Sequence, residues 1–147
     1  MKPTFSATPM VLTALAALLS AGPGMAQTAS SGEITLSASL SGPVETPKGD
    51  PDGAGTFTAR LNAGHDQLCY TLTSTMIGAP TAAHIHTGKQ GEAGPPVVPL
   101  QPQATDSCIA IDKAVADKIL ADPSSYYVNV HNAEYPRGAV RGQLTSG

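Results

Sequence analysis

The side chains best suited to coordination chemistry are the histidines, and the chain has four of them. His84 and His86 are separated by a single residue, Ile85. Residues two apart in a β-strand point to the same face. If this segment is a strand, the two imidazoles lie side by side, about 7 Å apart at the backbone, and can converge on one ion. The spacing therefore predicts a two-histidine metal claw, with Ile85 turned into the core.

His131 is the third histidine that the predicted strands bring to this side of the molecule. It ends an apolar-rich segment in which Tyr126, Val128 and Val130 alternate with other residues and should face the core. His131 then lies on the outer face, together with His84 and His86 if the two strands are neighbours. Imidazole ligands suit copper or zinc. The sequence predicts a site for one of these metals at the three histidines.

Two readings without a metal remain open for the same residues. Exposed histidines are ordinary on a β surface, and a pair spaced like His84 and His86 can instead hydrogen-bond to loop carbonyls and order the Gly/Pro-rich segment that follows. His65 lies in a turn, Ala63 to Asp66, and is expected to be a solvated loop residue.

The elements that must position these side chains are short strands. Alternating apolar and polar residues, separated by turn-forming residues, predict strands at 33–40, 57–61, 68–73, 83–86, 97–100, 107–111, 126–131 and 139–144. One segment differs: Lys113–Ala121 has helical spacing, with Asp112 as its N-cap and Pro123 just beyond its end. The pattern predicts an all-β protein, an antiparallel sandwich or barrel with one short helix.

The N-terminus has the pattern of a secretory signal peptide. Lys2 precedes an apolar run at residues 11–19, and Gly24-Met25-Ala26 forms a small-x-small cleavage site. The run is too short to span a bilayer, which needs about 20 apolar residues. We therefore expect residues 1–26 to be removed, residues 27–147 to form one domain, and the protein to be periplasmic or secreted.

The remaining chain contains two cysteines, Cys69 and Cys108. An even pair in an exported protein usually forms a disulfide. A redox or metal-binding thiol pair is the rival reading, but the C-x-x-C spacing is lacking. We predict a structural Cys69–Cys108 bond.

Composition argues against several functional classes. The formal net charge is −3 and the chain has no run of Lys or Arg, so the electrostatic footprint of a nucleic-acid binder is missing. No serine has the G-x-S-x-G context of a hydrolase nucleophile. Arg141 alternates with Val140 and Leu144, which are expected in the core, and is therefore expected on the exposed face near Gln143. It is interpreted either as a contact to a partner or an anion, or as a surface ion pair with Glu134.

Several motifs together resemble the CHRD domain, the module named after chordin and common in bacterial exported proteins. They are Leu40-Ser41-Gly42, Glu45-Thr46-Pro47, Ala83-His84-Ile85-His86-Thr87-Gly88, Gly94-Pro95, Tyr127-Val128-Asn129-Val130-His131, Pro136-Arg137-Gly138 and Arg141-Gly142-Gln143-Leu144. The resemblance covers nearly all of the chain after residue 33. It implies a β-sandwich of immunoglobulin-like or superoxide-dismutase-like character and no settled activity.

The His84–His86 pair is also similar to the copper claw of copper/zinc superoxide dismutases. A complete copper and zinc site needs more histidines than the four present, so that resemblance implies at most a copper-only site. His84, His86 and His131 would supply it, completed by His65, Met76 or water.

Three functions follow as expectations. The first is an exported binding module, more plausibly non-catalytic than enzymatic, with copper or zinc or an unknown extracellular partner as its ligand. The second is a copper-only, dismutase-like redox enzyme. The third is a purely structural or adhesive module in which the histidines only pack and hydrogen-bond.

Overall fold

The structure is a computed structural model that describes residues 32–62 and 64–147. The predicted signal peptide, residues 1–26, lies outside the described residues. The strands are β1 (Ile34–Ser41), β2 (Ala54–Leu61), β3 (Gln67–Thr75), β4 (Pro80–Thr87), β5 (Pro96–Leu100), β6 (Ala104–Ala110), β7 (Tyr126–Asn132), β8 (Val140–Gln143) and β9 (Thr145–Ser146). The helices are α1 (Lys113–Ala121) and two 3₁₀ turns, η1 (Gly42–Val44) and η2 (Pro123–Ser125).

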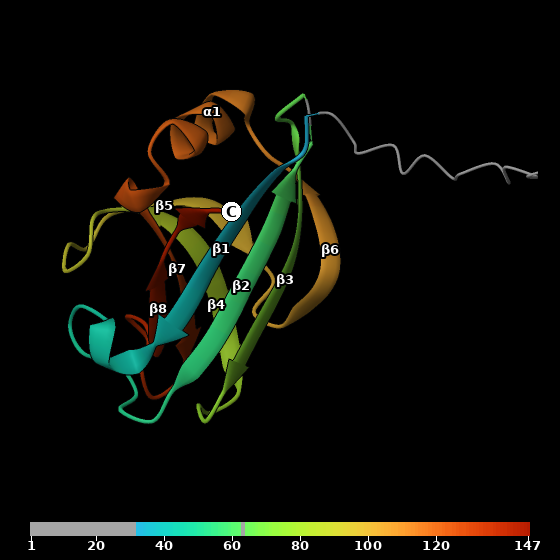
Figure 1. Ribbon diagram of the computed structural model, residues 1–147. Helices are drawn as coiled ribbons and strands as arrows, with labels where there is room; N and C mark the ends of the chain where they lie inside the picture. Colours follow the sequence, from blue (N-terminus) through green and yellow to red (C-terminus); the bar gives the residue numbers. More distant parts are fainter. Residues whose placement is uncertain (1–31, 63) are drawn as a thin grey trace, which may run out of the picture.

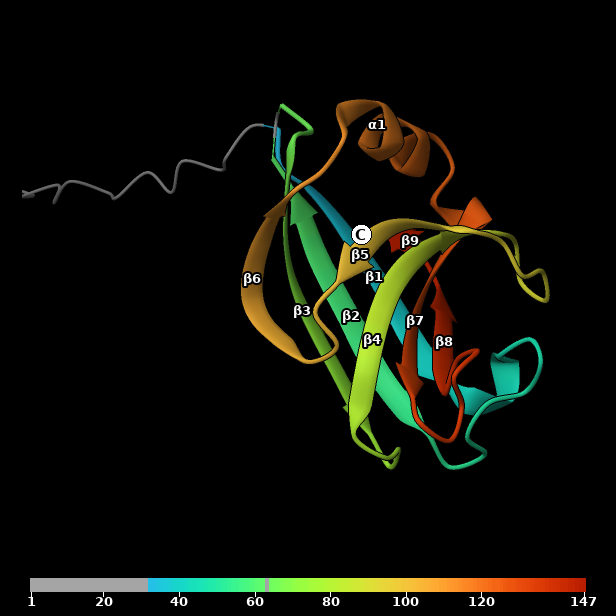
Figure 2. The ribbon, with the colours of Figure 1, turned by 180° about the vertical axis from the view of Figure 1, so that it is seen from behind.

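The strands form one curled antiparallel sheet with the order β5-β4-β7-β8-β1-β2-β3-β6, and β9 pairs with β1. The curl brings two halves face to face: β1, β2 and β3 stand in front of β4, β7 and β8 in Figure 1, and Figure 2 shows the reverse side. The halves join where β1 meets β8, through the pair Ser41 and Arg141. The prediction of an all-β antiparallel fold with one short helix is confirmed.

The core lies between the two halves and follows the predicted alternation. β1 and β2 bury every second residue, and alternate residues of β4, β7 and β8 face the core from the opposite side. The residues with the largest fully buried apolar side chains are Tyr70, Phe57, Leu36, Leu61, Leu68, Leu72, Ile85, Ile119, Leu144, Val128 and Val130. Burial of an aliphatic or aromatic side chain of this size stabilises a fold by roughly 1.5–3 kcal/mol.

Helix α1 covers one open end of the curled sheet (Figure 1). Its bounds are those predicted, because Asp112 caps it: the Asp112 carboxylate accepts a hydrogen bond from the Val115 amide at 3.1 Å. Ala116 and Ile119 are its buried residues and pack into the core. The spacing of these two residues fixes the helix face that meets the sheet.

The two cysteines are directly opposite each other on neighbouring strands. Cys69 of β3 pairs with Cys108 of the edge strand β6, and the two sulfurs are bonded. The predicted disulfide is confirmed. It holds β6, which ends the sheet, against the body of the fold.

Strand β7 is buried on both faces, which alternation alone did not predict. Val128 and Val130 face the core as expected, but Tyr127 and Asn129 on the other face are also buried. Two loops cover this second face: residues 88–95, between β4 and β5, and residues 42–50, which follow β1. The outer side of β4, β7 and β8 is therefore a small polar interior rather than open surface.

Candidate metal centre

The three predicted histidines come together on this polar face. His84 and His86 lie on β4, and His131 lies on β7, which pairs with β4. One candidate ligand atom from each residue lies within 4.8 Å of those of the other two. The prediction that the three imidazoles share one face, with Ile85, Val128 and Val130 buried beneath, is confirmed.

Two of the histidines have one ring nitrogen committed to a backbone carbonyl. His86 Nδ1 lies 2.8 Å from the Gly94 carbonyl, and His131 Nδ1 lies 3.1 Å from the Pro136 carbonyl. A carbonyl only accepts, so both Nδ1 atoms carry the proton. In each neutral ring this leaves the lone pair on Nε2, the atom that could bind a metal. The Nε2 of His86 has no partner among the described residues, whereas the Nε2 of His131 accepts a hydrogen bond from His84 Nδ1, which a metal ion would replace. Carbonyl partners of this kind fix the tautomer and ring orientation of metal-ligating histidines.

One ring nitrogen of His86 lacks a hydrogen-bond partner in the described part of the chain. His86 Nε2 is buried and has no hydrogen-bond partner among the described residues. A buried polar atom without a partner costs about 1–3 kcal/mol, so such atoms call for an unplaced water or ion. A metal ion between the three rings would satisfy it.

The closest nitrogens have a separation that suits one ion. His84 Nδ1 lies 3.2 Å from His131 Nε2. Two nitrogens that bind one ion at about 2.0–2.1 Å in a tetrahedral arrangement lie about 3.3 Å apart. His86 completes the group with its ring centroid 5.4 Å from that of His84 and 6.2 Å from that of His131.

The electrostatics favour neutral imidazoles, the form that ligates. Burial lowers the pKa of His84, and the neighbouring charges of His131 and His86 lower it further. Burial also lowers the pKa of His131, against the opposing effect of its bond to Pro136. In the described part of the chain, the metal-capable group consists of these histidines alone and includes no carboxylate. A divalent ion bound here would keep its full positive charge.

Arg141 is the site residue that the sequence analysis placed wrongly. It is only 2% exposed, so it is neither a surface contact for a partner nor a surface ion pair. Its guanidinium donates to the carbonyls of Glu92 and Lys89, at 2.6 and 2.7 Å, rather than to the Glu134 carboxylate. The prediction failed because residues 88–95 fold over the face that alternation assigned to solvent.

The other candidate ligands stand apart from the cluster. His65, in the turn between β2 and β3, binds the Asp117 carboxylate at 2.7 Å and so is not simply solvated. Met76 is 67% exposed in the turn between β3 and β4. Neither residue belongs to the group of three, so the completing ligand is left to water or to an external molecule.

A second buried polar group on the same face was missed from the sequence. Glu45 is buried, and its pKa is raised by burial, while the Thr46 amide, the Arg141 charge and Asn129 act in the opposite direction. One oxygen of its carboxyl group and the side-chain oxygen of Asn129 have no partner in the described residues. The signal in the sequence was indirect. The bulky neighbours Tyr126 and Tyr127 indicate that β7 is covered on both faces, because a strand buried on both faces carries apolar or bulky residues at successive positions.

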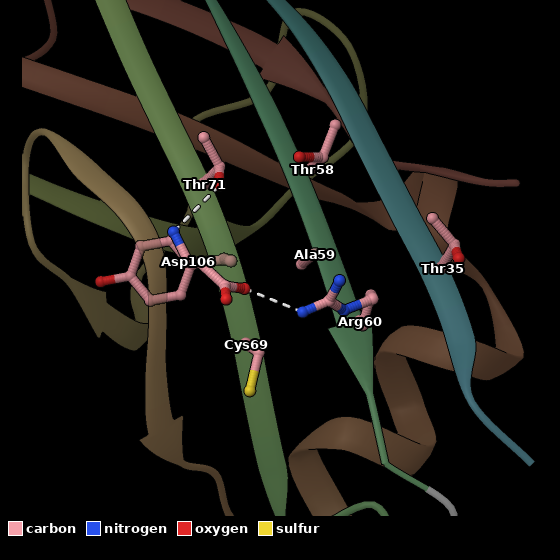
Figure 3. Close-up of a pocket in the computed structure, with 8 residues that line it drawn as sticks. Thr35, Thr58, Ala59, Arg60, Cys69, Thr71 and Asp106 are labelled. Carbon is pink, nitrogen blue, oxygen red and sulfur yellow. Dashed lines mark hydrogen bonds and ion pairs between the residues drawn. The ribbon is translucent and has the colours of Figure 1, made fainter. Parts of the chain in front are cut away.

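The outer face of the other half of the sheet, formed by β1, β2 and β3, holds a cavity of about 220 Å³ (Figure 3). It lies over β2 and β3, where Arg60 binds the Asp106 carboxylate at 2.8 Å and the Asp106 amide donates to the Thr71 hydroxyl. Its charged groups neutralise each other, and Cys69 in its wall is disulfide-bonded. The histidine face is the better candidate for chemistry.

The comparisons with known proteins give a family. The model of the CHRD domain matches residues 36–144, well over half of the chain, and the match includes all three histidines and both cysteines. Neither the search of curated proteins nor the search of solved structures found a match. No helix in the described part of the chain is long and apolar enough to cross a membrane. On the strength of the family match, the chain belongs to the CHRD domain family.

Proposed function

We propose that this CHRD domain is an exported binding module that holds a copper or zinc ion at His84, His86 and His131. The observation that carries the proposal is the buried, unpartnered Nε2 of His86 beside two other imidazoles. Neutral imidazole is a ligand for both metals, and soft sulfur ligands are not part of the group. Export is supported by the Cys69–Cys108 bond, because disulfides persist in oxidising compartments.

The chemistry that such an ion would supply is binding at an open coordination position. Three protein ligands leave a tetrahedral ion one further position. His84 and His131 are partly exposed, so solvent or a small ligand would have access to an ion held by these rings. If the ion were copper, the same arrangement would suit the second candidate, a dismutase-like redox enzyme, because redox chemistry needs both a held copper ion and room for substrate.

Calorimetric titration with Cu(II) and Zn(II) tests the binding module. The wild-type protein should bind one ion, and binding should raise its melting temperature, as does any ligand specific to the folded state. His84→Ala/His86→Ala should abolish both effects. His65→Ala is the matched control and should leave both nearly unchanged, since His65 lies in another part of the fold.

Equal metal binding by the wild type and the double variant would rule out the cluster as the metal site. No binding by the wild type would favour the structural or adhesive reading of the histidines. Removal of superoxide by the copper-loaded protein, and not by the double variant, would favour the redox enzyme over the binding module.

A further inference from the structure

Residues 88–95, here called the strap, connect β4 to β5 and fold back over the polar face. In Figure 2 the strap is the yellow loop that follows the end of β4 and projects from the molecule. The first residue of the strap is held at both backbone groups: its amide donates to the Ser125 carbonyl at 2.8 Å, and its carbonyl accepts from the Gln143 side chain at 2.7 Å. The strap is therefore fixed to η2 and β8 before it reaches the histidines.

The far end of the strap clasps His86. The Gly94 carbonyl accepts from His86 Nδ1 at 2.8 Å, and the Gly94 amide donates to the Tyr127 hydroxyl at 3.4 Å. The Tyr127 ring stacks on the His86 imidazole with centroids 4.8 Å apart and planes 12° apart. One strap residue and one ring thus fix both the rotation and the tautomer of His86.

Arg141 supports this arrangement from the opposite side of β7. Its guanidinium carbon lies 3.4 Å from the centroid of the Tyr127 ring. Because β4 and β8 flank β7, His86 and Arg141 stack on opposite faces of that ring. The guanidinium also donates to two strap carbonyls, those of Lys89 and Glu92. A planar, forked donor can make two such bonds while stacked on an aromatic ring, and a lysine cannot.

We infer that Arg141, acting through the strap and Tyr127, is a positioning residue that holds His86 in the orientation a metal ion requires. The inference rests on the proposed metal site, but the orientation of His86 can also be measured without a metal. It gives the buried guanidinium a role in place of the two that were expected from the sequence, a contact to a partner or anion and a surface ion pair with Glu134. It also makes Gly94 necessary, because a Cβ there would collide with the Thr87 carbonyl.

Two variants perturb the arrangement at its two ends. Arg141→Lys keeps the positive charge but loses the planar guanidinium with its two donors. Gly94→Ala displaces the strap from Thr87 and leaves the Arg141 side chain itself unchanged. Both should weaken Zn(II) and Cu(II) binding by about 10–100-fold, the usual effect of removing a partner that orients a ligand. Gln90→Ala, an exposed strap residue, is the control and should change the dissociation constant by less than about twofold.

A double-mutant cycle separates positioning from a general loss of structure. If Arg141 acts through His86, Arg141→Lys should change metal affinity by less than about threefold when His86→Ala is already present. Circular dichroism and melting curves of the metal-free proteins check that each variant is folded. An equally large loss in the His86→Ala background would overturn the inference.

NMR of the metal-free protein distinguishes failure of this inference from failure of the metal site. The ¹⁵N shifts of His86 should show a proton fixed on Nδ1 in the wild type and in Gln90→Ala. Mixed tautomers are expected in Arg141→Lys and Gly94→Ala, and Gly94→Ala alone carries the test if Arg141→Lys does not fold. Unchanged His86 shifts in the folded variants would contradict the inference. A wild type that binds neither metal yet shows the fixed tautomer would overturn only the metal site.

Discussion

The carbonyls of Gly94 and Pro136 determine which ring nitrogens of His86 and His131 carry the proton and which carry the lone pair. By accepting from Nδ1 of His86 and His131, they place the lone pair of each ring on Nε2. In His131 this lone pair accepts a hydrogen bond from His84, and in His86 it has no partner among the described residues. Burial, which lowers the pKa of His84 and His131, keeps those rings neutral at a lower pH than a free histidine. The fixed rings and the unpartnered buried nitrogen of His86 are the features that a cation at the proposed site would use.

Metal affinity should therefore decline on acidification, but at a lower pH than for a site made of free histidines. A free imidazole is half protonated near pH 6.5, and protons compete with a metal for the same lone pair. Since the pKa values of His84 and His131 are lowered, protons should compete with the metal at these two rings at a more acidic pH than they do at a free imidazole. Zn(II) titrations between about pH 5 and pH 8 measure this. A midpoint at or above pH 6.5 would contradict the prediction.

Glu45 should make stability fall as the pH rises. Burial raises its pKa in the folded state above the value of 4.5 for a free side chain, so the folded protein binds the proton more tightly than the unfolded chain does. The stabilisation is complete below pH 4.5 and is lost as the pH rises through the folded pKa. Glu45→Gln has no proton to lose, so its stability relative to the wild type should increase from about pH 4 to pH 7. Urea unfolding across this range would show it, and a constant difference would count against the burial effect.

At the scale of elements, each strand places its functional side chains by register. His84 of β4 lies opposite Asn129 of β7, which lies opposite Arg141 of β8, and His86 lies opposite Tyr127. The alternation that sends Ile85 and Val128 into the core thus sends these polar groups to one shared face. Helix α1 has a different task, since it covers the open end of the sheet with Ala116 and Ile119.

The cap of α1 offers a test of that helix. Asp112→Ala removes the side chain that accepts from the Val115 amide and should destabilise the protein by about 1 kcal/mol, the usual value for an N-cap. Lys118→Ala, an exposed change in the same helix, should cost less than about 0.5 kcal/mol. Chemical unfolding of both variants gives the comparison. An Asp112→Ala variant as stable as Lys118→Ala would mean that the cap contributes nothing.

At the scale of the whole molecule, one continuous sheet makes two facing layers. The layers share a narrow seam between β1 and β8, while the edge strand β6 is joined to β3 by the disulfide as well as by hydrogen bonds. A chain with one Phe in the described part and no Trp anywhere builds its core mainly from aliphatic residues, with Phe57, Tyr70 and Tyr126 as the aromatic members. Covalent restraint of an edge strand adds stability that such a core does not supply.

Loss of the disulfide should therefore be costly. The bond joins two residues that are 39 apart in sequence. Closing a loop of this length stabilises the folded state by roughly 4 kcal/mol on the chain-entropy estimate. Cys69→Ser/Cys108→Ser should lower the melting temperature while keeping the β-type circular dichroism spectrum. Intact mass with and without reductant checks that the bond forms in protein from the exported compartment. Two free thiols in that material would contradict the prediction.

The sequence by itself determined eight of the nine strands, though β2, β4 and β6 begin three residues earlier than predicted and β9 was missed, as well as helix α1, the cysteine pair and the meeting of three histidines. Each depends on a local rule: a period of two along a strand, a capping residue, or a matching pair of cysteines. The burial of His86, Glu45 and Arg141 was decided only by the tertiary structure. Strand alternation separates two faces but does not tell which loop returns to cover one of them. The strap covers its face through backbone carbonyls, which every residue type carries, so its contacts leave little trace in the identity of the residues that make them.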